Sequence, residues 1–362
     1  MREFADEHLR PHVAEWSEQA TFPAHLPSLM AELGVLGMHL EGDGLPGASS
    51  VEYGLACMEL EAVDSGLRTF VSVQGSLAMT AIHHFGSDDQ RAEWLAPMAA
   101  GEALACFALT EPEAGSDPSS MATFARRDGS DWVLDGHKRW IGMGTRADVA
   151  VVWAQTDDGV RGFLVPRDAP GFSARDIMGK LSMRAAVQSE LELDRCRLPA
   201  SAMLPGARGM RGPFTCLGEA RYGIVWGSMG AARDAYECAL AYAKRREVFG
   251  KPIAAFQLTQ QKLVEMAIAV NNGSLLALHL GRMKDDGRLR PHQVSFGKLN
   301  NVRAALAVAR EARTVLGGNG VTLEHSPMRH ASNLESVLTY EGTSEIHTLV
   351  LGQAITGESA LR

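Results

Sequence analysis

The feature that most constrains this chain is the spacing of its hydrophobic residues, which changes twice along the sequence. Residues 1 to about 103, and residues from about 213 onward, place hydrophobic side chains three or four positions apart, as amphipathic helices require. Between these regions, from about 104 to 205, short β-prone runs alternate with turn residues such as Asp135-Gly136. The chain is therefore predicted to fold in the order helices, β-structure, helices.

The two helical regions contain recognisable helices with stop signals. In the N-terminal region, helices are predicted over 26–36, 53–63 and 77–86, and glycine follows or ends the first and third. The C-terminal region carries long helical patterns joined by short polar turns, which is typical of a helical bundle. These patterns cover about 224–242, 256–285, 291–316, 328–338 and 344–356.

The central region contains four β-prone runs. No helical pattern of about 10–15 residues separates them, which favours an antiparallel sheet or barrel over a parallel sheet. The runs cover 132–134, 149–154, 162–165 and 190–193.

Composition excludes several classes of protein. The net charge of −8 disfavours a role in nucleic-acid binding. Five cysteines without a CxxC pair indicate reduced thiols and a reducing compartment, and no Cys/His cluster indicates a metal. The polar start does not resemble a signal peptide, and no apolar run approaches the ~20 residues of a membrane span. High alanine and arginine usage is typical of a GC-rich bacterium, so a cytoplasmic setting is expected.

Two glycine-containing segments are candidates for binding a cofactor. The segment from Phe107 to Asp117 leaves a strand-like run for a loop with hydroxyls at Thr110 and Ser116. Free backbone N–H groups in such a loop can hold a planar cofactor or a phosphate, although an ordinary turn explains the residues alone better. The glycines at 317–320 follow a helix instead of a strand, which disfavours a nicotinamide dinucleotide site and favours a helix stop.

Two charged residues have both a functional and a structural interpretation. Glu341 precedes Gly342 between two helical segments, and a following hydroxyl residue can cap the second. A desolvated carboxylate on such a loop is a useful base; the alternative is a surface glutamate. Arg68 either pairs weakly with Asp64 on a helix surface or binds a substrate carboxylate. The residues alone leave both choices open.

Seven segments, in order along nearly the whole chain, resemble the acyl-CoA dehydrogenase family and, within it, the glutaryl-CoA dehydrogenases. Agreement of this kind over many ordered segments is specific. The segments are Val63–Gly66 with Arg68, Cys106–Pro112, Gly115–Met121, Ala220–Ile224, Leu316–Gly320, Arg329–Glu335 and Tyr340–Thr343.

The resemblance implies an α+β fold with three domains. An N-terminal α-helical domain is expected over 1–103, a central antiparallel β-domain over 104–205 and a C-terminal four-helix bundle over 206–362. FAD is expected between the β-domain and the bundle. A homotetramer, an acyl-CoA substrate and an electron-transferring flavoprotein as the electron acceptor are also implied.

The resemblance also assigns roles to residues, with Glu341 as the catalytic base. Gly142 stands where the family usually has a threonine that contacts the flavin. The substrate-binding positions are Arg68, Glu61, Thr69, Ser116, Arg221, Tyr340 and Gly342. Positions near the flavin ring or its phosphates are Phe107, Leu109, Thr110, Ser116, Trp140, Ile141 and Gly142. Positions for the adenosine and pyrophosphate, often supplied by a neighbouring subunit, are Arg246, Phe249, Gln257, Leu316, Gly317, Gly318, Thr343 and Glu345.

The implied reaction is FAD-dependent α,β-dehydrogenation of a short acyl thioester, in which Glu341 removes the α-proton and the β-hydrogen leaves as hydride. Hydrogen bonds to the thioester carbonyl stabilise the developing enolate. Arg68 matches the arginine that binds the distal carboxylate of glutaryl-CoA, so oxidative decarboxylation to crotonyl-CoA is expected. Two alternatives stay open: a desaturase of a related acyl-CoA or acyl-carrier-protein thioester without decarboxylation, and a catalytically silent binding protein.

Overall fold

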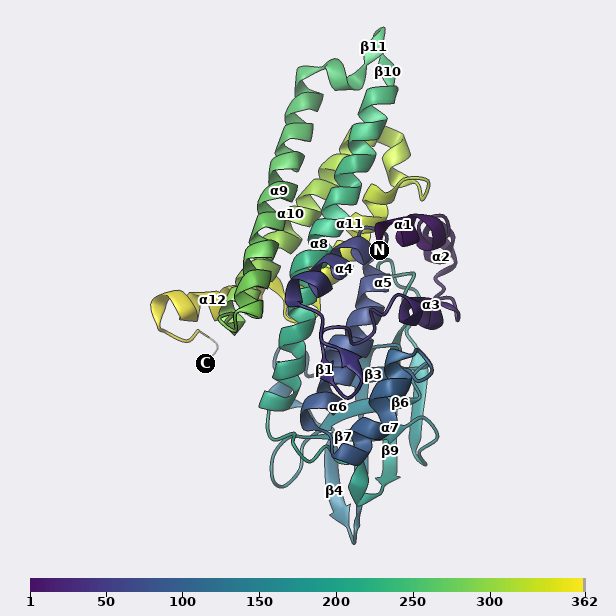
Figure 1. Ribbon diagram of the computed structural model, residues 1–362, viewed down its shortest axis with the longest axis vertical. Helices are drawn as coiled ribbons and strands as arrows, with labels where there is room; N and C mark the ends of the chain where they lie inside the picture. Colours follow the sequence, from purple (N-terminus) through teal and green to yellow (C-terminus); the bar gives the residue numbers. More distant parts are fainter. Residues whose placement is uncertain (361–362) are drawn as a thin grey trace.

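The first region of the structure, a computed structural model that describes residues 1–360, is helical as predicted (Figure 1). Side-chain caps at Ser49, Asp64 and Ser87 begin three of its helices, because each accepts a hydrogen bond from a backbone N–H of the first turn. The helices are α1 (Arg2–Phe4), α2 (Val13–Gln19), α3 (Leu26–Glu32), α4 (Ser50–Glu61), α5 (Ser65–Val71), α6 (Thr80–Phe85) and α7 (Asp88–Ala99). Two further helical segments are present: Ala5–Leu9 continues α1, and Ser72–Met79 joins α5 to α6. A short hairpin pairs β1 (Glu41–Gly42) with β2 (Leu45–Pro46).

The central region forms two sheets. One has the order β3-β6-β7 and the other has the order β4-β5-β9-β8. All neighbouring strands are antiparallel except β3 and β6, which run parallel. The strands are β3 (Ala105–Ala108), β4 (Phe124–Asp128), β5 (Asp131–Gly142), β6 (Val149–Ala154), β7 (Arg161–Pro166), β8 (Phe172–Asp176) and β9 (Gln188–Leu198).

Of these seven strands, β3 corresponds to the strand-like run before the loop that ends at Asp117, four match the predicted β-prone runs, and two edge strands were not predicted. The four β-prone runs correspond to β5, β6, β7 and β9, of which β6 is buried along its whole length. β4 and β8 were not predicted, because they are short, charged and mostly exposed and therefore carry no hydrophobic pattern. Their strand conformation comes from pairing with β5 and β9.

The last region is a bundle of long helices. Its members are α8 (Arg211–Arg245), α9 (Gln257–Asp285), α10 (Pro291–Leu316), α11 (Ser326–Thr339) and α12 (Ser344–Thr356). The hairpin of β10 (Glu247–Val248) and β11 (Lys251–Pro252) connects α8 to α9 at one end of the molecule, and α12 projects from the side of the bundle (Figure 1). Gly317, with φ +60°, ends α10, as the sequence predicted.

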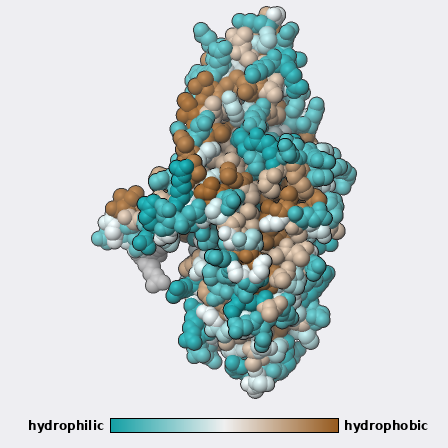
Figure 2. All heavy atoms as spheres, in the orientation of Figure 1, coloured by the Kyte–Doolittle hydropathy of each residue, from teal (hydrophilic) through white to brown (hydrophobic). Residues whose placement is uncertain are grey.

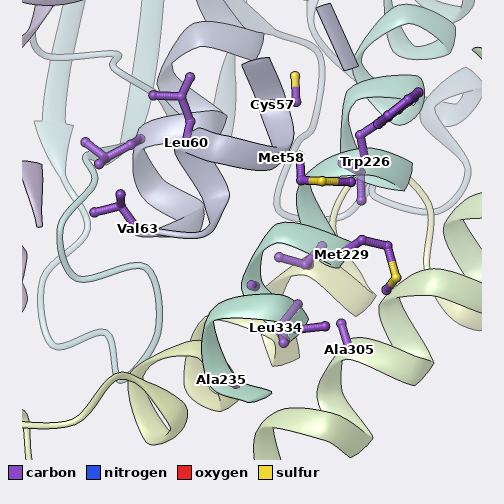
Figure 3. Close-up of a cluster of buried hydrophobic side chains, with 14 of the residues drawn as sticks. Cys57, Met58, Leu60, Val63, Trp226, Met229, Ala235, Ala305 and Leu334 are labelled. Atoms are coloured by element: carbon purple, nitrogen blue, oxygen red, sulfur yellow. The ribbon is translucent and has the colours of Figure 1, made fainter. Parts of the chain in front are cut away.

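Small residues on α8 let α4 pack directly against it. A Cβ atom on Gly227 would lie 2.0 Å from Oε2 of Glu61, and one on Gly230 would lie 1.9 Å from the carbonyl oxygen of Met58. The hydrophobic core continues from this contact to α10 and α11, where Trp226, Met229, Ala305 and Leu334 lie in one cluster (Figure 3). The close approach of α4 carries the carboxylate of Glu61 into the interior.

Helix α9 has a hydrophobic outer face. Among the residues that the structure describes, α9 is the single helix that is long and apolar enough to cross a membrane, judged by length and composition alone. The prediction that no apolar run approaches the length of a membrane span was therefore wrong. The helix packs against α8 and α10 in the bundle. Val264, Ile268 and Leu275 lie on its outer side and are 56%, 55% and 65% exposed, and hydrophobic atoms gather along this side of the molecule (Figure 2). The bundle therefore leaves one hydrophobic stripe uncovered.

Candidate active site

Glu341 lies in a tight turn between α11 and α12. Its φ is +54°, which is uncommon for a residue with a side chain and persists only where the surroundings hold it. Gly342 follows with φ +100°, and a Cβ atom there would lie 2.7 Å from Nε2 of His347, so only glycine fits. Thr343 then caps α12 by accepting a hydrogen bond from the backbone N–H of Ile346 at 3.3 Å. The predicted cap is confirmed, and the turn directs Glu341 toward the interior of the bundle.

Two basic side chains from different helices hold this turn. Nε of Arg221, on α8, donates to the carbonyl oxygen of Glu341 at 2.7 Å. Nζ of Lys298, on α10, donates to the carbonyl oxygen of Tyr340 and, at 2.7 Å, to that of Gly342. Three consecutive carbonyl groups of the turn are thus hydrogen-bonded to side chains.

The carboxylate of Glu341 is not engaged. The residue as a whole is half-buried, but its Oε2 is inaccessible to solvent and has no hydrogen-bond partner within residues 1–360. Burial raises the pKa of Glu341, and the positive charges of Arg68, Lys298 and Arg221 oppose that rise. A buried carboxylate with a raised pKa and a free oxygen is suited to accept a proton.

Arg68 is fully buried and is held by two partners. Its Nε donates to Oε2 of Glu61 at 2.7 Å, and its Nη2 donates to the hydroxyl of Tyr340. The alternative in which Arg68 pairs with Asp64 on a helix surface was wrong, because Asp64 caps α5 and accepts from Nδ2 of Asn333 at 2.9 Å. Nη1 of Arg68 is buried without a partner in the described part of the chain. The guanidinium therefore keeps an unused donor inside the protein.

The contacts around Arg68 extend to the end of strand β5. The hydroxyl oxygens of Thr69 and Tyr340 are 3.3 Å apart. Thr69, Val73 and Gly142 line one small pocket, so residues of α5, of the segment after it and of β5 meet there. The structure thus brings six of the predicted substrate residues together with one end of the β-domain. Ser116, the seventh, lies exposed on its loop.

A buried ion pair shapes the start of that loop. Phe107 and Leu109 are buried at the end of β3, and Thr110 is half-buried. Nζ of Lys138 donates to the carbonyl oxygen of Leu109 at 3.0 Å and to Oε1 of Glu111 at 2.8 Å. Burial lowers the pKa of Lys138 to about 8. The pair holds the chain where it leaves the strand, on both sides of Thr110.

Trp140 is presented to solvent by an irregular strand. Its φ is +63° and its side chain is 54% exposed, at a shift in the β5–β9 register between Lys138 and Ile141. Ile141 is buried beside it. An exposed indole on a strained backbone offers a flat aromatic surface next to the Gly142 pocket, which a planar cofactor can use.

The positions predicted for adenosine and pyrophosphate lie in two separate places. Arg246, Phe249 and Gln257 are exposed where α8 passes into α9, and Phe249 is 95% exposed. Leu316 ends α10, and Gly317 and Gly318 follow it in a short turn. This turn lies at the same end of the bundle, as the hydrogen bond from Nδ2 of Asn319 to the Tyr242 hydroxyl of α8, at 3.1 Å, shows. Thr343 and Glu345 lie instead at the start of α12.

The two places are far apart within one chain. Lys298 contacts Gly342 near the start of α12, and Leu316 lies five turns further along α10, about 27 Å at 1.5 Å per residue. The two groups therefore do not line one pocket within a single chain. The exposed group at the far end is available to another molecule.

Lys298 and His347 were not predicted as residues of the site. Lys298 shares a helix face with Val294 and Val302, and a lysine on an otherwise hydrophobic face was the available signal. His347 is buried beneath Gly342 with neither ring nitrogen hydrogen-bonded in the described residues, and burial lowers its pKa to about 3. No local pattern marked His347, because its place is set by the fold of the turn onto α12.

The Gly142 position provides a test of packing in this pocket. A Cβ atom on Gly142 would lie 3.0 Å from Cγ2 of Val73, so Gly142→Thr is expected to destabilise the protein by about 1–3 kcal/mol through overpacking. The double variant Gly142→Thr/Val73→Ala is expected to be more stable than the sum of the two single effects. Urea unfolding of the four proteins measures this coupling. Strict additivity would contradict the contact.

Comparisons with known proteins agree along the whole chain. Three family models match in order: the acyl-CoA dehydrogenase N-terminal domain over residues 1–102, the middle domain over 106–196 and the C-terminal domain over 207–356. The bovine mitochondrial short-chain specific acyl-CoA dehydrogenase is 35% identical over 361 residues, which is 97% of this chain and 87% of the bovine protein.

Solved structures show the same similarity. A glutaryl-CoA dehydrogenase from Mycobacterium smegmatis in complex with FADH2 is 61% identical with a TM-score of 0.99, over 100% of this chain and 94% of that one. A chain from a structural study of the electron-transferring flavoprotein of Acidaminococcus fermentans is 31% identical with a TM-score of 0.94, over 99% and 96% of the two chains.

Proposed function

Because this chain belongs to the acyl-CoA dehydrogenase family and is an FAD-dependent enzyme of that family, we propose that its substrate is glutaryl-CoA and that oxidation is followed by loss of CO2 to give crotonyl-CoA. The observation that carries the proposal is the unpartnered, buried Nη1 of Arg68. A buried guanidinium donor without an acceptor is costly unless a bound group satisfies it. The distal carboxylate of a dicarboxylyl thioester is such a group.

Glu341 is proposed to act as the base. Its free Oε2 accepts the α-proton of the thioester, and its backbone is held by Arg221 and Lys298. Since burial raises the pKa of Glu341, the acid form is stable enough to hold the proton after transfer. The base works only when ionised, so activity is expected to fall as the pH drops through this raised pKa.

FAD, when bound, takes up the electron pair and the hydrogen that leave the β-carbon. The exposed indole of Trp140, the hydroxyl of Thr110 and the pocket at Gly142 are proposed to hold its ring system. The exposed residues Arg246, Phe249, Gln257, Gly317 and Gly318, with Leu316, are proposed to complete the nucleotide site of a second copy, opposite that copy's Thr343 and Glu345.

The chain is accordingly proposed to form a homotetramer. The separation along α10 of the two groups proposed to bind the nucleotide supports an assembly of more than one chain. The uncovered stripe of Val264, Ile268 and Leu275 offers a hydrophobic surface for contact. An electron-transferring flavoprotein is proposed as the electron acceptor and the cytoplasm as the location.

A second candidate keeps the desaturation and omits the loss of CO2. It is favoured by the bovine relative, whose name specifies short-chain acyl-CoA, and by Gly142, which lacks the threonine side chain usual in the family. Its substrate would be a related short thioester on CoA or an acyl carrier protein.

Product analysis separates the two candidates. Purified protein is incubated with glutaryl-CoA and an artificial electron acceptor, and the thioester products are identified by mass. Crotonyl-CoA with equimolar CO2 is expected. Accumulation of glutaconyl-CoA would support the second candidate, and faster turnover of butyryl-CoA than of glutaryl-CoA would contradict the proposed substrate.

A further inference from the structure

Lys298 lies directly beneath the turn that carries Glu341, and we propose that it is a positioning residue for the base: it fixes the backbone on both sides of Glu341 and places a positive charge under its carboxylate. The inference rests on the proposed role of Glu341. Lys298 is 1% exposed, and its Nζ contacts the carbonyl oxygens of Tyr340 and Gly342.

The hydrogen bonds reach both peptide planes that meet at the Cα atom of Glu341. Lys298 holds the plane that contains the Tyr340 carbonyl, and Arg221 holds the next plane through the Glu341 carbonyl. Lys298 then holds a third plane at Gly342. Because two planes define φ and ψ of the residue between them, these contacts maintain the left-handed conformation of Glu341 and the direction of its side chain.

The contacts of Lys298 differ from those of an ordinary buried ion pair. Its hydrogen-bond acceptors are carbonyl groups, while the carboxylate of Glu341 stays free for a substrate proton. Burial lowers the pKa of Lys298 to about 7, and the charge of Glu341 opposes that change. The charged and titratable groups around Glu341 are Cys57 and Glu61 on α4, Arg68 on α5, Arg221 on α8, Lys298 on α10, Tyr340 beside it and His347 on α12.

Removal of the lysine charge should therefore make the base harder to ionise. Lys298→Met removes both the donor and the charge, and Lys298→Gln keeps an amide donor without charge. Lys262→Met is the matched control, because Lys262 forms an ion pair with Glu311 between α9 and α10, away from the turn. Glu341→Gln is measured in parallel.

The assay is anaerobic flavin reduction by stopped flow from pH 5 to 9, with glutaryl-CoA or butyryl-CoA, whichever reduces wild type faster. FAD content and thermal unfolding are measured on the same samples. Exchange of the α-protons of acetyl-CoA in D2O is followed by mass, since acetyl-CoA has no β-carbon and reports proton abstraction alone.

Lys298→Met is expected to slow flavin reduction and α-proton exchange by about 100-fold, as misplacement of a reacting group does. Lys298→Gln is expected to retain more of the rate. In both, the acid limb of the pH profile should move about one unit to higher pH, because loss of a nearby cation raises the pKa of a carboxyl group. FAD content in Lys298→Gln, and every property of Lys262→Met, should match wild type.

Wild-type rates and an unmoved acid limb in both Lys298 variants would overturn the inference. A loss explained by lost FAD or unfolded protein, with the acid limb unmoved, would also overturn it and leave Lys298 a structural role. If Glu341→Gln is inactive and the Lys298 variants behave like wild type, only the role of Lys298 is rejected. If Glu341→Gln is active, Glu341 is rejected as the base.

Discussion

Glu341→Gln is expected to slow flavin reduction by the acyl thioester by about 10⁴-fold, the upper range for loss of a general base. The amide has the shape of the carboxylate but cannot take up the α-proton. The backbone contacts of the turn, from Arg221 to the Glu341 carbonyl and from Lys298 to the Gly342 carbonyl, do not involve the side chain and should persist. Stopped-flow absorbance of the bound flavin measures the rate, and the ratio of flavin to protein absorbance measures FAD content.

The matched control for this variant is Glu335→Gln. Glu335 lies on α11, a few residues before the turn, and its side chain is 54% exposed in an ion pair with Arg310. Because exposed ion pairs contribute about 0–1 kcal/mol, this variant should keep wild-type stability and rate. Reduction of the flavin by Glu341→Gln at the wild-type rate would reject Glu341 as the base.

Arg68→Met is expected to lower kcat/KM for glutaryl-CoA relative to butyryl-CoA by about 10–100-fold, because a hydrogen bond to a charged group contributes about 1.5–3 kcal/mol. The effect should be selective, since butyryl-CoA has no distal carboxylate for Nη1 to bind. Parallel steady-state kinetics with the two substrates measures the ratio. An equal loss on both substrates would contradict the carboxylate-binding role.

Arg68→Met is also expected to destabilise the protein, and this effect must be separated from its effect on substrate specificity. Arg68→Met leaves the buried carboxylate of Glu61 without its partner. Breaking a buried ion pair lowers the free energy of unfolding by about 3–5 kcal/mol. Arg68→Met/Glu61→Gln removes that unpaired charge and should recover part of the stability, as measured by urea unfolding. The substrate ratio should remain low in the double variant, because the proposed contact with the distal carboxylate is made by Arg68.

The sequence alone predicted the order helices, β-structure, helices because the relevant signals are short-range. The helical patterns at 256–285 and 291–316 correspond to α9 and α10 almost residue for residue, since periodicity and nearby Gly or Pro define such helices locally. The cap at Thr343 was likewise evident from neighbouring residues. The charged edge strands β4 and β8 were missed because pairing with other strands, and not their own pattern, makes them β-structure.

The resemblance singled out Glu341 and Arg68, but only tertiary structure decided the surroundings of each. The residues left open whether Arg68 pairs with Asp64 four positions earlier; the fold pairs it with Glu61, which α4 brings into the interior because Gly227 leaves room. The sequence indicated a role for Lys298 only weakly, because the role of a buried lysine can be assigned only when its hydrogen-bond partners are known.

The order helices, β-structure, helices and the ends of helices such as α9 and α10 are properties of the sequence itself, because each depends on residues within a few positions of one another. The candidate base, Glu341, was identified only through the resemblance over many segments of the chain. The pairing of buried charges, the anchoring of the Glu341 turn by Arg221 and Lys298, and the distance between the two nucleotide-binding groups belong to the tertiary structure. They depend on which distant segments pack together, and that packing is set by the whole chain at once.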